Sequence, residues 1–453
     1  MQSGHTNLNT DSVSIEDLKD LMHIVEYNGF SSKYNPMNAE TCEWVKLNFK
    51  GVHSVVKRAD KKLALLANDV QEGDILIKLN KFPEKLTKFT QVNEKLIHDF
   101  ERYGFHKFLV LKSLKKITPK QEKQKKDFEK ANLLFSKLKE GIQLRDEASI
   151  AVENLFDNTR KGKLNAKEVK HYTQKIISSE TTDAISAIVS LKESDQTYAH
   201  CIEVGTIFYS TYSERIKRKN IPSVFKSKSE ILLAAFLHDI GKSGIPKDVL
   251  DSTIRYKPDS KEMKSIRNHP RISAKLLYKM GLPDYIINMA HYHHVKYQPG
   301  MQTSYPTEIN YDQVNPETRL LSIVDLYQAL IGKRRYKKSW IPPEAMRYLE
   351  TLGDIEFDGE TWDDFFDIIG VYPVGSLLKL SDKSTAFVIG VSESNPERPQ
   401  VAVVKDQNGR ELDRNPFLDL ENIPELSIAE ELDPNEIFGD ETLGVFENIN
   451  LVN

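Results

Sequence analysis

Apolar residues recur at helical spacing through most of the chain between residues 128 and 368, and this pattern limits the fold more than any other feature. Segments such as ANLLFSKLKEGI, CIEVGTIFYSTYSERI and RLLSIVDLYQALI place apolar side chains three or four positions apart. The turn signals GIPKD, MGLPD and IPPEA separate such segments. We therefore expect a central all-α helical bundle over residues 131–368.

The residues before the bundle mix two periods. Residues 17–25 have helical spacing, and residues 43–49 and 74–80 alternate as strands do. Residues 94–105 return to helical spacing. We expect residues 1–115 to form a small mixed α/β module with a regulatory or sensory role. Residues 116–130 are rich in lysine and almost free of apolar side chains, so we expect a linker there.

The residues after the bundle change character again. Residues 369–415 contain short runs rich in β-branched residues, bounded by Gly, Pro, Asn and Asp, which predicts a small β-rich module. No lysine or arginine follows Arg414, so we expect residues 416–453 to trail as an acidic tail. The chain as a whole is therefore expected to be multidomain.

Charge and hydropathy exclude two broad classes of protein. The net charge of −3 argues against a nucleic-acid partner. The chain contains no apolar run near the roughly 18 residues that a membrane span needs, which predicts no membrane partner. Because the N-terminus is polar and acidic, we expect no secretory signal and a cytoplasmic location.

Histidine and aspartate gather on or at the ends of the apolar helices. These residues are His200, His238, Asp239, His269, His293, His294 and Asp325. Asp239 follows an apolar run near a helix C-terminus, where an unpaired buried carboxylate would cost several kcal/mol. A shared metal would compensate that charge, although each of these residues judged alone has an ordinary structural explanation.

The types of ligand restrict the metal. Several imidazoles with two carboxylates and no convergent thiolate suit iron, manganese, nickel or zinc better than calcium or magnesium. The candidates outnumber the ligands of one tetrahedral ion, so two bridged metal ions fit the set better.

The order of these motifs resembles the HD superfamily of metal-dependent phosphohydrolases. The stretches HDIGKSGIPKDVL, the HH doublet followed by YP, and DLYQALIGKRRYK resemble more closely the HD-GYP family of cyclic di-GMP phosphodiesterases. The resemblance covers about residues 130–350. The C-terminal β-module also resembles the segment that often follows HD-GYP domains.

The resemblance implies roles for individual residues. The metal ligands would be His200, His238, Asp239, His269, His293, His294 and Asp325. Asp239 would bridge two divalent transition-metal ions, Fe or Mn in the first place and Ni or Zn as alternatives. Gln196 stands where members with a third metal carry glutamate. Lys242 would lie beside the substrate phosphate, and Arg334, Lys337 and Tyr305 would contact the substrate.

The chain departs from the family in the loop after the HH doublet. Val295 stands where glutamate is usual, Gln298 where aspartate is usual, and Ser304 replaces the glycine before Tyr305 and Pro306. Three hypotheses remain open. The chain hydrolyses cyclic di-GMP to linear pGpG, GMP or both through a metal-activated water; it is a weak or inactive cyclic dinucleotide receptor; or it is an HD phosphohydrolase for another nucleotide. A protein partner at this loop or the N-terminal module, and a homodimer, also remain open.

Overall fold

The computed structural model describes residues 119–452 apart from 193–196, 251, 253–255, 333–338 and 393, together with seven strands between residues 12 and 112. The chain divides into two units, residues 1–122 and residues 123–453. Each unit is described by itself.

The strands of the first unit form two antiparallel sheets. One has the order β1 (Ser12–Ser14), β7 (Lys107–Lys112), β2 (Met22–Tyr27). The other has the order β3 (Lys33–Pro36), β6 (Ile75–Lys78), β4 (His53–Arg58), β5 (Lys61–Leu66).

Strand β6 lies where alternation indicates a strand, whereas residues 22–25, which have helical spacing in the sequence, belong to β2. The strand expected at residues 43–49 lies outside the described residues. Pairing of β2 with β7 outweighs that local spacing. The remaining residues of the expected α/β module lie outside the described residues, so its mixed character stays a prediction.

Helix α3 (Pro119–Arg160) starts inside the expected linker. Its first residues are good helix formers after a proline at the first helical position, so residues 119–130 of the lysine-rich stretch are helical. The ring of Phe128 packs edge-on against Phe417, with centroids 5.4 Å apart. Residues 123–130 are thus part of the second unit rather than a connector.

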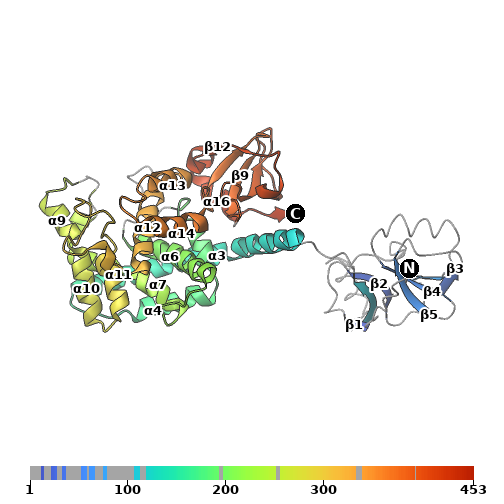
Figure 1. Cartoon of the computed structure of the whole chain (residues 1–453), viewed down its shortest axis with the longest axis horizontal. Coiled ribbons are helices and arrows are strands. Elements are labelled where there is room, and N and C mark those ends of the chain that lie inside the picture. The colour runs from blue at the N-terminus through green and yellow to red at the C-terminus, as the bar shows by residue number, and fades with distance from the viewer. Residues whose placement is uncertain are drawn as a thin grey trace. The chain divides into compact units, whose positions relative to one another are not determined.

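The helical bundle is confirmed by the structure. Its core lies between helices α3, α6 (Tyr198–Lys219), α7 (Lys228–Phe236), α11 (Asp284–Tyr292), α12 (Pro316–Ile331) and α14 (Gly359–Ile369). Further helices are α4 (Lys167–Ser178), α5 (Thr182–Ala187), α8 (Lys247–Leu250), α9 (Lys261–Arg267), α10 (His269–Lys279), α13 (Pro342–Glu350), and the 3₁₀ turns η3 (Ile240–Gly244) and η4 (Tyr311–Gln313). Figure 1 shows α6, α7, α11 and α12 close together in the bundle.

Side-chain caps fix where several of these helices begin. Ser227 accepts a hydrogen bond from Glu230 N at the start of α7, and Asn315 accepts one from Thr318 N at the start of α12. Such caps satisfy amide groups that a helix start leaves free. They set the phase of two helices that carry or lead into the candidate metal ligands.

A six-stranded mixed sheet forms the C-terminal part. Its order is β12 (Ile428–Leu432), β8 (Leu377–Leu380), β9 (Thr385–Gly390), β10 (Gln400–Lys405), β11 (Asn415–Asp419), β13 (Leu451–Val452), and β11 and β13 pair in parallel. Helices α15 (Pro434–Phe438) and α16 (Thr442–Glu447) and the turns η5 (Leu420–Asn422) and η6 (Gly439–Glu441) complete it.

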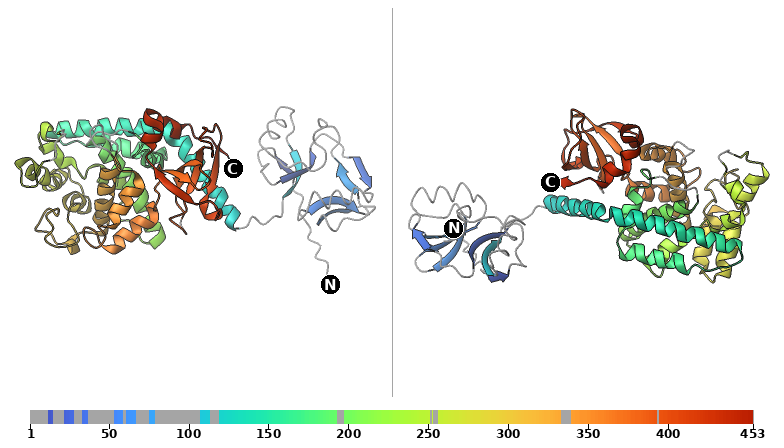
Figure 2. Two further views of the ribbon diagram at one scale, coloured as in Figure 1. Left: turned by 90° about the horizontal axis from the view of Figure 1, so that it is seen from above. Right: turned by 180° about the vertical axis from the view of Figure 1, so that it is seen from behind.

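The structure corrects the expected acidic tail. Residues 416–453 contain most of β11, the strands β12 and β13, and the helices α15 and α16. Phe446 and Ile449 are buried with Phe387 of β9. Burial of these apolar side chains outweighs the missing positive charge of the segment. The same apolar cluster includes Leu134 and Leu138 of α3, so the sheet packs on the first half of that helix. Figure 2 shows α3 running from the sheet along the bundle.

Among the described residues, every helix is too short or too polar to cross a lipid bilayer.

Candidate metal centre

Five helices of the bundle bring the predicted ligands together. His200 lies in the first turn of α6, His238 and Asp239 follow α7, and His269 starts α10. His293 and His294 follow α11, and Asp325 lies in α12. All seven fall into three overlapping groups whose ligand atoms lie within 4.8 Å of one another in each group. The groups are His200/His238/Asp325, His269/His293/His294 and His238/Asp239/His293.

Asp239 lies between the first two groups. Its Oδ1 atom is 2.9 Å from His269 Nε2 and 3.8 Å from His293 Nε2. Its Oδ2 atom is 3.4 Å from His238 Nε2 and 3.6 Å from His200 Nε2. Each carboxylate oxygen therefore faces a different group, which is the arrangement of a carboxylate that bridges two cations.

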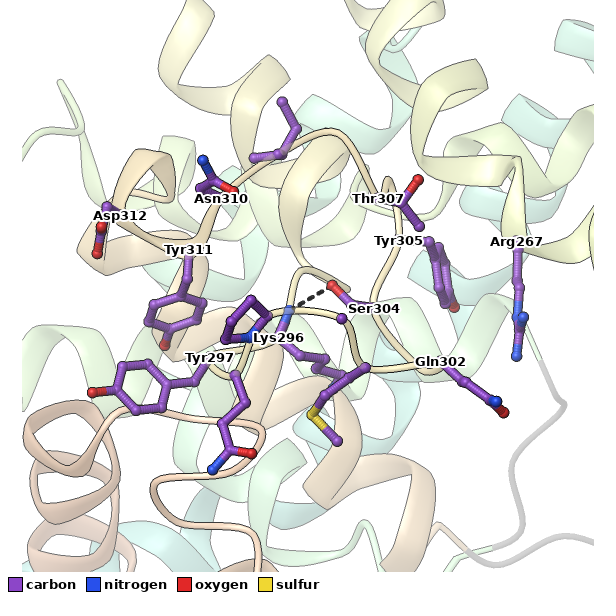
Figure 3. Close-up of a pocket in the computed structure, with 15 residues that line it drawn as sticks. Arg267, Lys296, Tyr297, Gln302, Ser304, Tyr305, Thr307, Asn310, Tyr311 and Asp312 are labelled. Atoms are coloured by element: carbon purple, nitrogen blue, oxygen red, sulfur yellow. Dashed lines mark hydrogen bonds between the residues drawn. The ribbon is translucent and has the colours of Figure 1, made fainter.

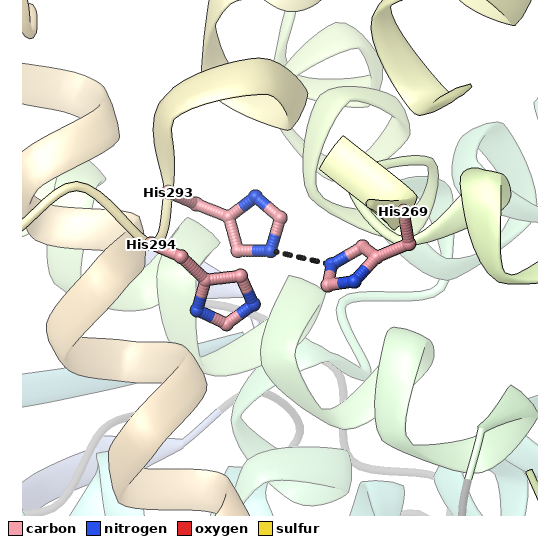
Figure 4. A group of neighbouring side chains, drawn as sticks. All are labelled: His269, His293 and His294. Carbon is pink, nitrogen blue, oxygen red and sulfur yellow. Dashed lines mark hydrogen bonds between the residues drawn. The ribbon is translucent and has the colours of Figure 1, made fainter. Parts of the chain in front are cut away.

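The histidines point Nε2 into the centre and use Nδ1 for outer contacts. His238 Nδ1 lies 2.6 Å from the carbonyl of Ala235, and His269 Nδ1 lies 2.7 Å from that of Ile266. His293 Nδ1 lies 3.1 Å from a carbonyl in the same way. A carbonyl can only accept, so Nδ1 carries the proton and Nε2 keeps the lone pair that a metal needs. Figure 4 shows the rings of the second group turned toward one another.

Two buried atoms of the centre lack hydrogen-bond partners among the described residues. They are Nε2 of His238 and Oδ1 of Asp239. Unsatisfied buried polar atoms are costly, and both atom types are metal-ligand types. The residues of this centre thus fit divalent transition-metal ions.

The first group holds protons tightly. Burial lowers the pKa of His238, but the carboxylates of Asp239 and Asp325 outweigh it and raise that pKa to about 10. Burial likewise opposes protonation of His200, yet the same two carboxylates raise its pKa. Burial works against ionisation of both aspartates, while the neighbouring cations hold each pKa well below the usual range.

Two histidines of the second group, His293 and His294, are neutral. Burial and the neighbouring imidazoles hold the pKa values of His293 and His294 well below the usual range. Neutral imidazole is the form that binds metal. The two halves of the centre therefore differ in the protons that a metal would displace.

Lys242 lies one turn after Asp239 and forms an ion pair with its Oδ2 atom. Its side chain stays 20% exposed, whereas Asp239 is 1% exposed. Gly241 between them is required by space: a Cβ there would lie 2.0 Å from the carbonyl oxygen of His269 and 2.6 Å from Ser273 N. This glycine lets η3 pack against the start of α10, which places Asp239 beside His269.

Tyr305 connects the centre to a cavity of about 520 Å³. Its ring lies 4.5 Å from that of His294, and its amide donates to the His294 carbonyl at 3.2 Å. The guanidinium carbon of Arg267 lies 6.0 Å from the centroid of the Tyr305 ring. Figure 3 shows Tyr305 and Arg267 side by side in the wall of this cavity. The cavity is also lined by Lys296, Tyr297, Gln298, Gln302, Asn310 and Tyr311.

The residues that depart from the family pattern have structural contacts. Val295 is 1% exposed and packs with Tyr311 and Val314. Gln298 donates a side-chain hydrogen bond to the Asp354 carbonyl, and Ser304 accepts one from Lys296 N. An apolar side chain at position 295 supplies no ligand, so the structure offers no carboxylate there for a further cation.

Three residues of this region escaped sequence reasoning. His200 Nδ1 lies 2.5 Å from Gln328 Oε1, and Gln328 in turn contacts Glu203, which pairs with Arg145 of α3. The only signal is spacing, because Gln328 is three residues after Asp325 and Glu203 three residues after His200, on the same helix faces. The predicted substrate contacts Arg334 and Lys337 lie outside the described residues.

Comparison with known proteins finds two matching family models and several similar sequences. Residues 195–361 match the family model "HD domain", and residues 377–439 match "KOW domain associated with HD domain". A cyclic di-GMP phosphodiesterase of Pseudomonas aeruginosa is 26% identical over 284 residues, which are 62% of this chain and 62% of the relative.

Two further relatives cover smaller shares. A cyclic di-GMP phosphodiesterase of Borreliella burgdorferi is 26% identical over 46% of this chain and 54% of its own length. A 3'3'-cGAMP-specific phosphodiesterase of Vibrio cholerae is 32% identical over 26% of this chain and 24% of its own length. The matches thus span less than two thirds of each relative, and they confirm the resemblance that the motifs indicate.

Proposed function

Because the chain carries an HD domain of the HD-GYP type, we propose that it is a metal-dependent phosphodiesterase that hydrolyses cyclic di-GMP to linear pGpG, GMP or both. The observation that carries the proposal is the position of Asp239. Its two oxygens face two separate groups, each with three further candidate ligands. A centre for two cations at the edge of a cavity suits cleavage of a phosphodiester.

The metals would supply Lewis acidity and a bound water of lowered pKa. In this proposal His200, His238 and Asp325 would hold one ion, His269, His293 and His294 would hold the other, and Asp239 would contribute one carboxylate oxygen to each. The chemistry of the ligands favours Fe or Mn, with Ni or Zn as alternatives.

In this proposal Lys242 acts on the substrate phosphate. Its ammonium lies at the bridging carboxylate and its side chain is partly exposed. A cation there would stabilise the negative charge that grows on the phosphoryl oxygens during cleavage. Tyr305 would form the wall beside the phosphate, and Arg334 and Lys337 stay predicted contacts to the nucleotide.

The altered loop favours a second candidate. Val295 is buried where the family pattern has glutamate, so the substrate side of the centre differs from that pattern. The chain could act on another cyclic dinucleotide, such as 3'3'-cGAMP, or bind one without turnover.

The test uses purified chain loaded with Mn²⁺ or Fe²⁺ and incubated with cyclic di-GMP or 3'3'-cGAMP, with chromatography of the products. We expect linear pGpG or GMP from cyclic di-GMP, loss of product with a chelator, and loss of product in Asp239→Ala. Asp183→Asn, an exposed aspartate on α5, is the matched control. Bound but unchanged ligand would favour a receptor, and absence of both binding and product would contradict cyclic dinucleotides as ligands.

A further inference from the structure

We propose that Glu203 and Gln328 are positioning residues that hold His200 in the tautomer able to bind metal. His200 belongs to the first ligand group through Nε2, which lies 3.0 Å from Asp325 Oδ1. This inference rests on the metal binding in the proposed function and does not depend on the substrate.

The contacts form a continuous buried chain behind the metal centre. His200 Nδ1 lies 2.5 Å from Gln328 Oε1, and Gln328 Nε2 donates to Glu203 Oε2 at 2.5 Å. Arg145 Nε donates to Glu203 Oε1 at 2.8 Å. Glu203 and Gln328 are 0% exposed, Arg145 is 3% exposed and His200 is 4% exposed. Water therefore has little access to replace these hydrogen bonds.

The order of donors and acceptors fixes the proton on His200. A guanidinium can only donate, and the carboxylate of Glu203 beside it can only accept. The amide of Gln328 must therefore turn its NH₂ group toward Glu203 and its oxygen toward His200. That oxygen accepts from Nδ1, so the proton stays on Nδ1 and the lone pair on Nε2 faces the metal centre.

His200 differs in this respect from three other histidines of the centre. His238, His269 and His293 place Nδ1 against backbone carbonyls, which cannot change from acceptor to donor. The side-chain amide of Gln328 can rotate and offer NH₂ instead. Among the described residues, Glu203 and its partner Arg145 make that rotation unfavourable. These buried charges therefore determine which end of the Gln328 amide faces His200.

Glu203→Gln tests the inference with almost no change of shape. A glutamine at 203 can donate to Gln328, which frees the amide of Gln328 to turn its NH₂ group toward His200. The proton then moves to Nε2 and blocks metal. We expect the affinity for one of two bound Mn²⁺ ions to fall about 10–100-fold, which is the usual range for loss of an outer-shell partner. The affinity for the other ion should stay unchanged.

Calorimetric titration of the purified full chain with Mn²⁺ measures both affinities, and thermal unfolding of the metal-free chain is recorded beside it. Glu214→Gln on the same helix is the matched control, because Glu214 pairs with Lys217 and Arg218 away from the centre. Arg145→Lys keeps a donor-only cation and should retain both Mn²⁺ affinities. Arg145→Met should lower the affinity for the same ion as Glu203→Gln does. If Glu203→Gln fails to fold, Gln328→Leu removes the oxygen that accepts from His200 Nδ1 and should lower the affinity for that ion equally.

The outcomes separate this inference from the proposed function. Unchanged Mn²⁺ affinities in Glu203→Gln, or equal weakening of both ions, overturn the positioning role. A parent chain that binds two Mn²⁺ ions without cleaving cyclic di-GMP overturns the proposed function alone. A parent chain that binds no Mn²⁺ overturns both.

Discussion

Oδ1 of Asp239 lies 2.9 Å from Nε2 of His269, on the side of the carboxylate that faces away from His200. One aspartate thus touches both ligand groups. If Asp239 bridges two ions, its replacement should reduce the binding of both ions. Replacement of a ligand in one group should reduce mainly the binding of one ion.

Asp239→Asn should therefore reduce bound metal in both groups, and His294→Ala should reduce it mainly in one. An amide has one acceptor oxygen in place of two and carries no charge, so it cannot bridge two cations. Elemental analysis of purified variants measures metal per chain, with Asp183→Asn as control. Retention of the parent metal content in Asp239→Asn contradicts the bridge.

Metal affinity should rise with pH, and more steeply for one ion. Asp239 and Asp325 overcome burial and raise the pKa of His238 to about 10, and they raise that of His200 as well. His238 therefore keeps its proton through neutral pH and metal must displace it, and the raised pKa of His200 moves the loss of its proton to higher pH. Affinity then increases by up to about tenfold per pH unit for each proton released and levels off above pH 10.

The measurement is a Mn²⁺ titration at pH 6.5, 7.5 and 8.5 in buffers of different ionisation enthalpy, which counts the protons released. The ion at the neutral pair His293 and His294 should release fewer protons. Equal release at both ions would contradict the charge difference between the two groups.

Gly241→Ala should destabilise the chain and disturb the centre. The added methyl would lie 2.0 Å from the His269 carbonyl oxygen, and relief of that clash should cost about 1–3 kcal/mol in the free energy of unfolding. Urea unfolding measures it. Gly244→Ala, where the nearest atom is a flexible end of Ile272 at 3.3 Å, serves as control and should change stability by about 0.5 kcal/mol or less.

Tyr305→Phe should leave KM for the nucleotide almost unchanged, whereas Tyr305→Ala should raise it several-fold. The ring packs 4.5 Å from His294, so its aromatic face shapes the wall of the cavity. Steady-state kinetics on both variants checks this. A large effect of Tyr305→Phe would show that the hydroxyl, and not the ring, contacts the substrate.

Phe446→Ala should destabilise the second unit by about 3–5 kcal/mol, the range for loss of a buried aromatic side chain. Phe446 is fully buried and its ring lies 5.1 Å from that of Phe387. Denaturant unfolding measures the change, with the exposed Ile437→Ala as control. A loss below about 1 kcal/mol would mean that this segment behaves as the loose tail that its charge suggests.

The grouping of the candidate ligands could be predicted because each stands beside an apolar helical run in an ordered set of motifs such as HDIGK and HH. Gln328, Glu203 and Arg145 could not, because isolated polar residues in helices carry no sign of which distant side chain they meet. The charge of residues 416–453 predicts a tail, but this segment folds onto the sheet because its apolar side chains pack into a core. They are Phe438, Phe446 and Ile449. Pairing of β2 with β7 likewise depends on residues about 80 positions apart, beyond the reach of local periodicity.

The most direct test of the whole account is anomalous diffraction from crystals of the chain grown with Mn²⁺, recorded near the manganese absorption edge. The account predicts two peaks, one on each side of the Asp239 carboxylate, with His200, His238 and Asp325 around one and His269, His293 and His294 around the other. A single peak, or peaks away from Asp239, would contradict it.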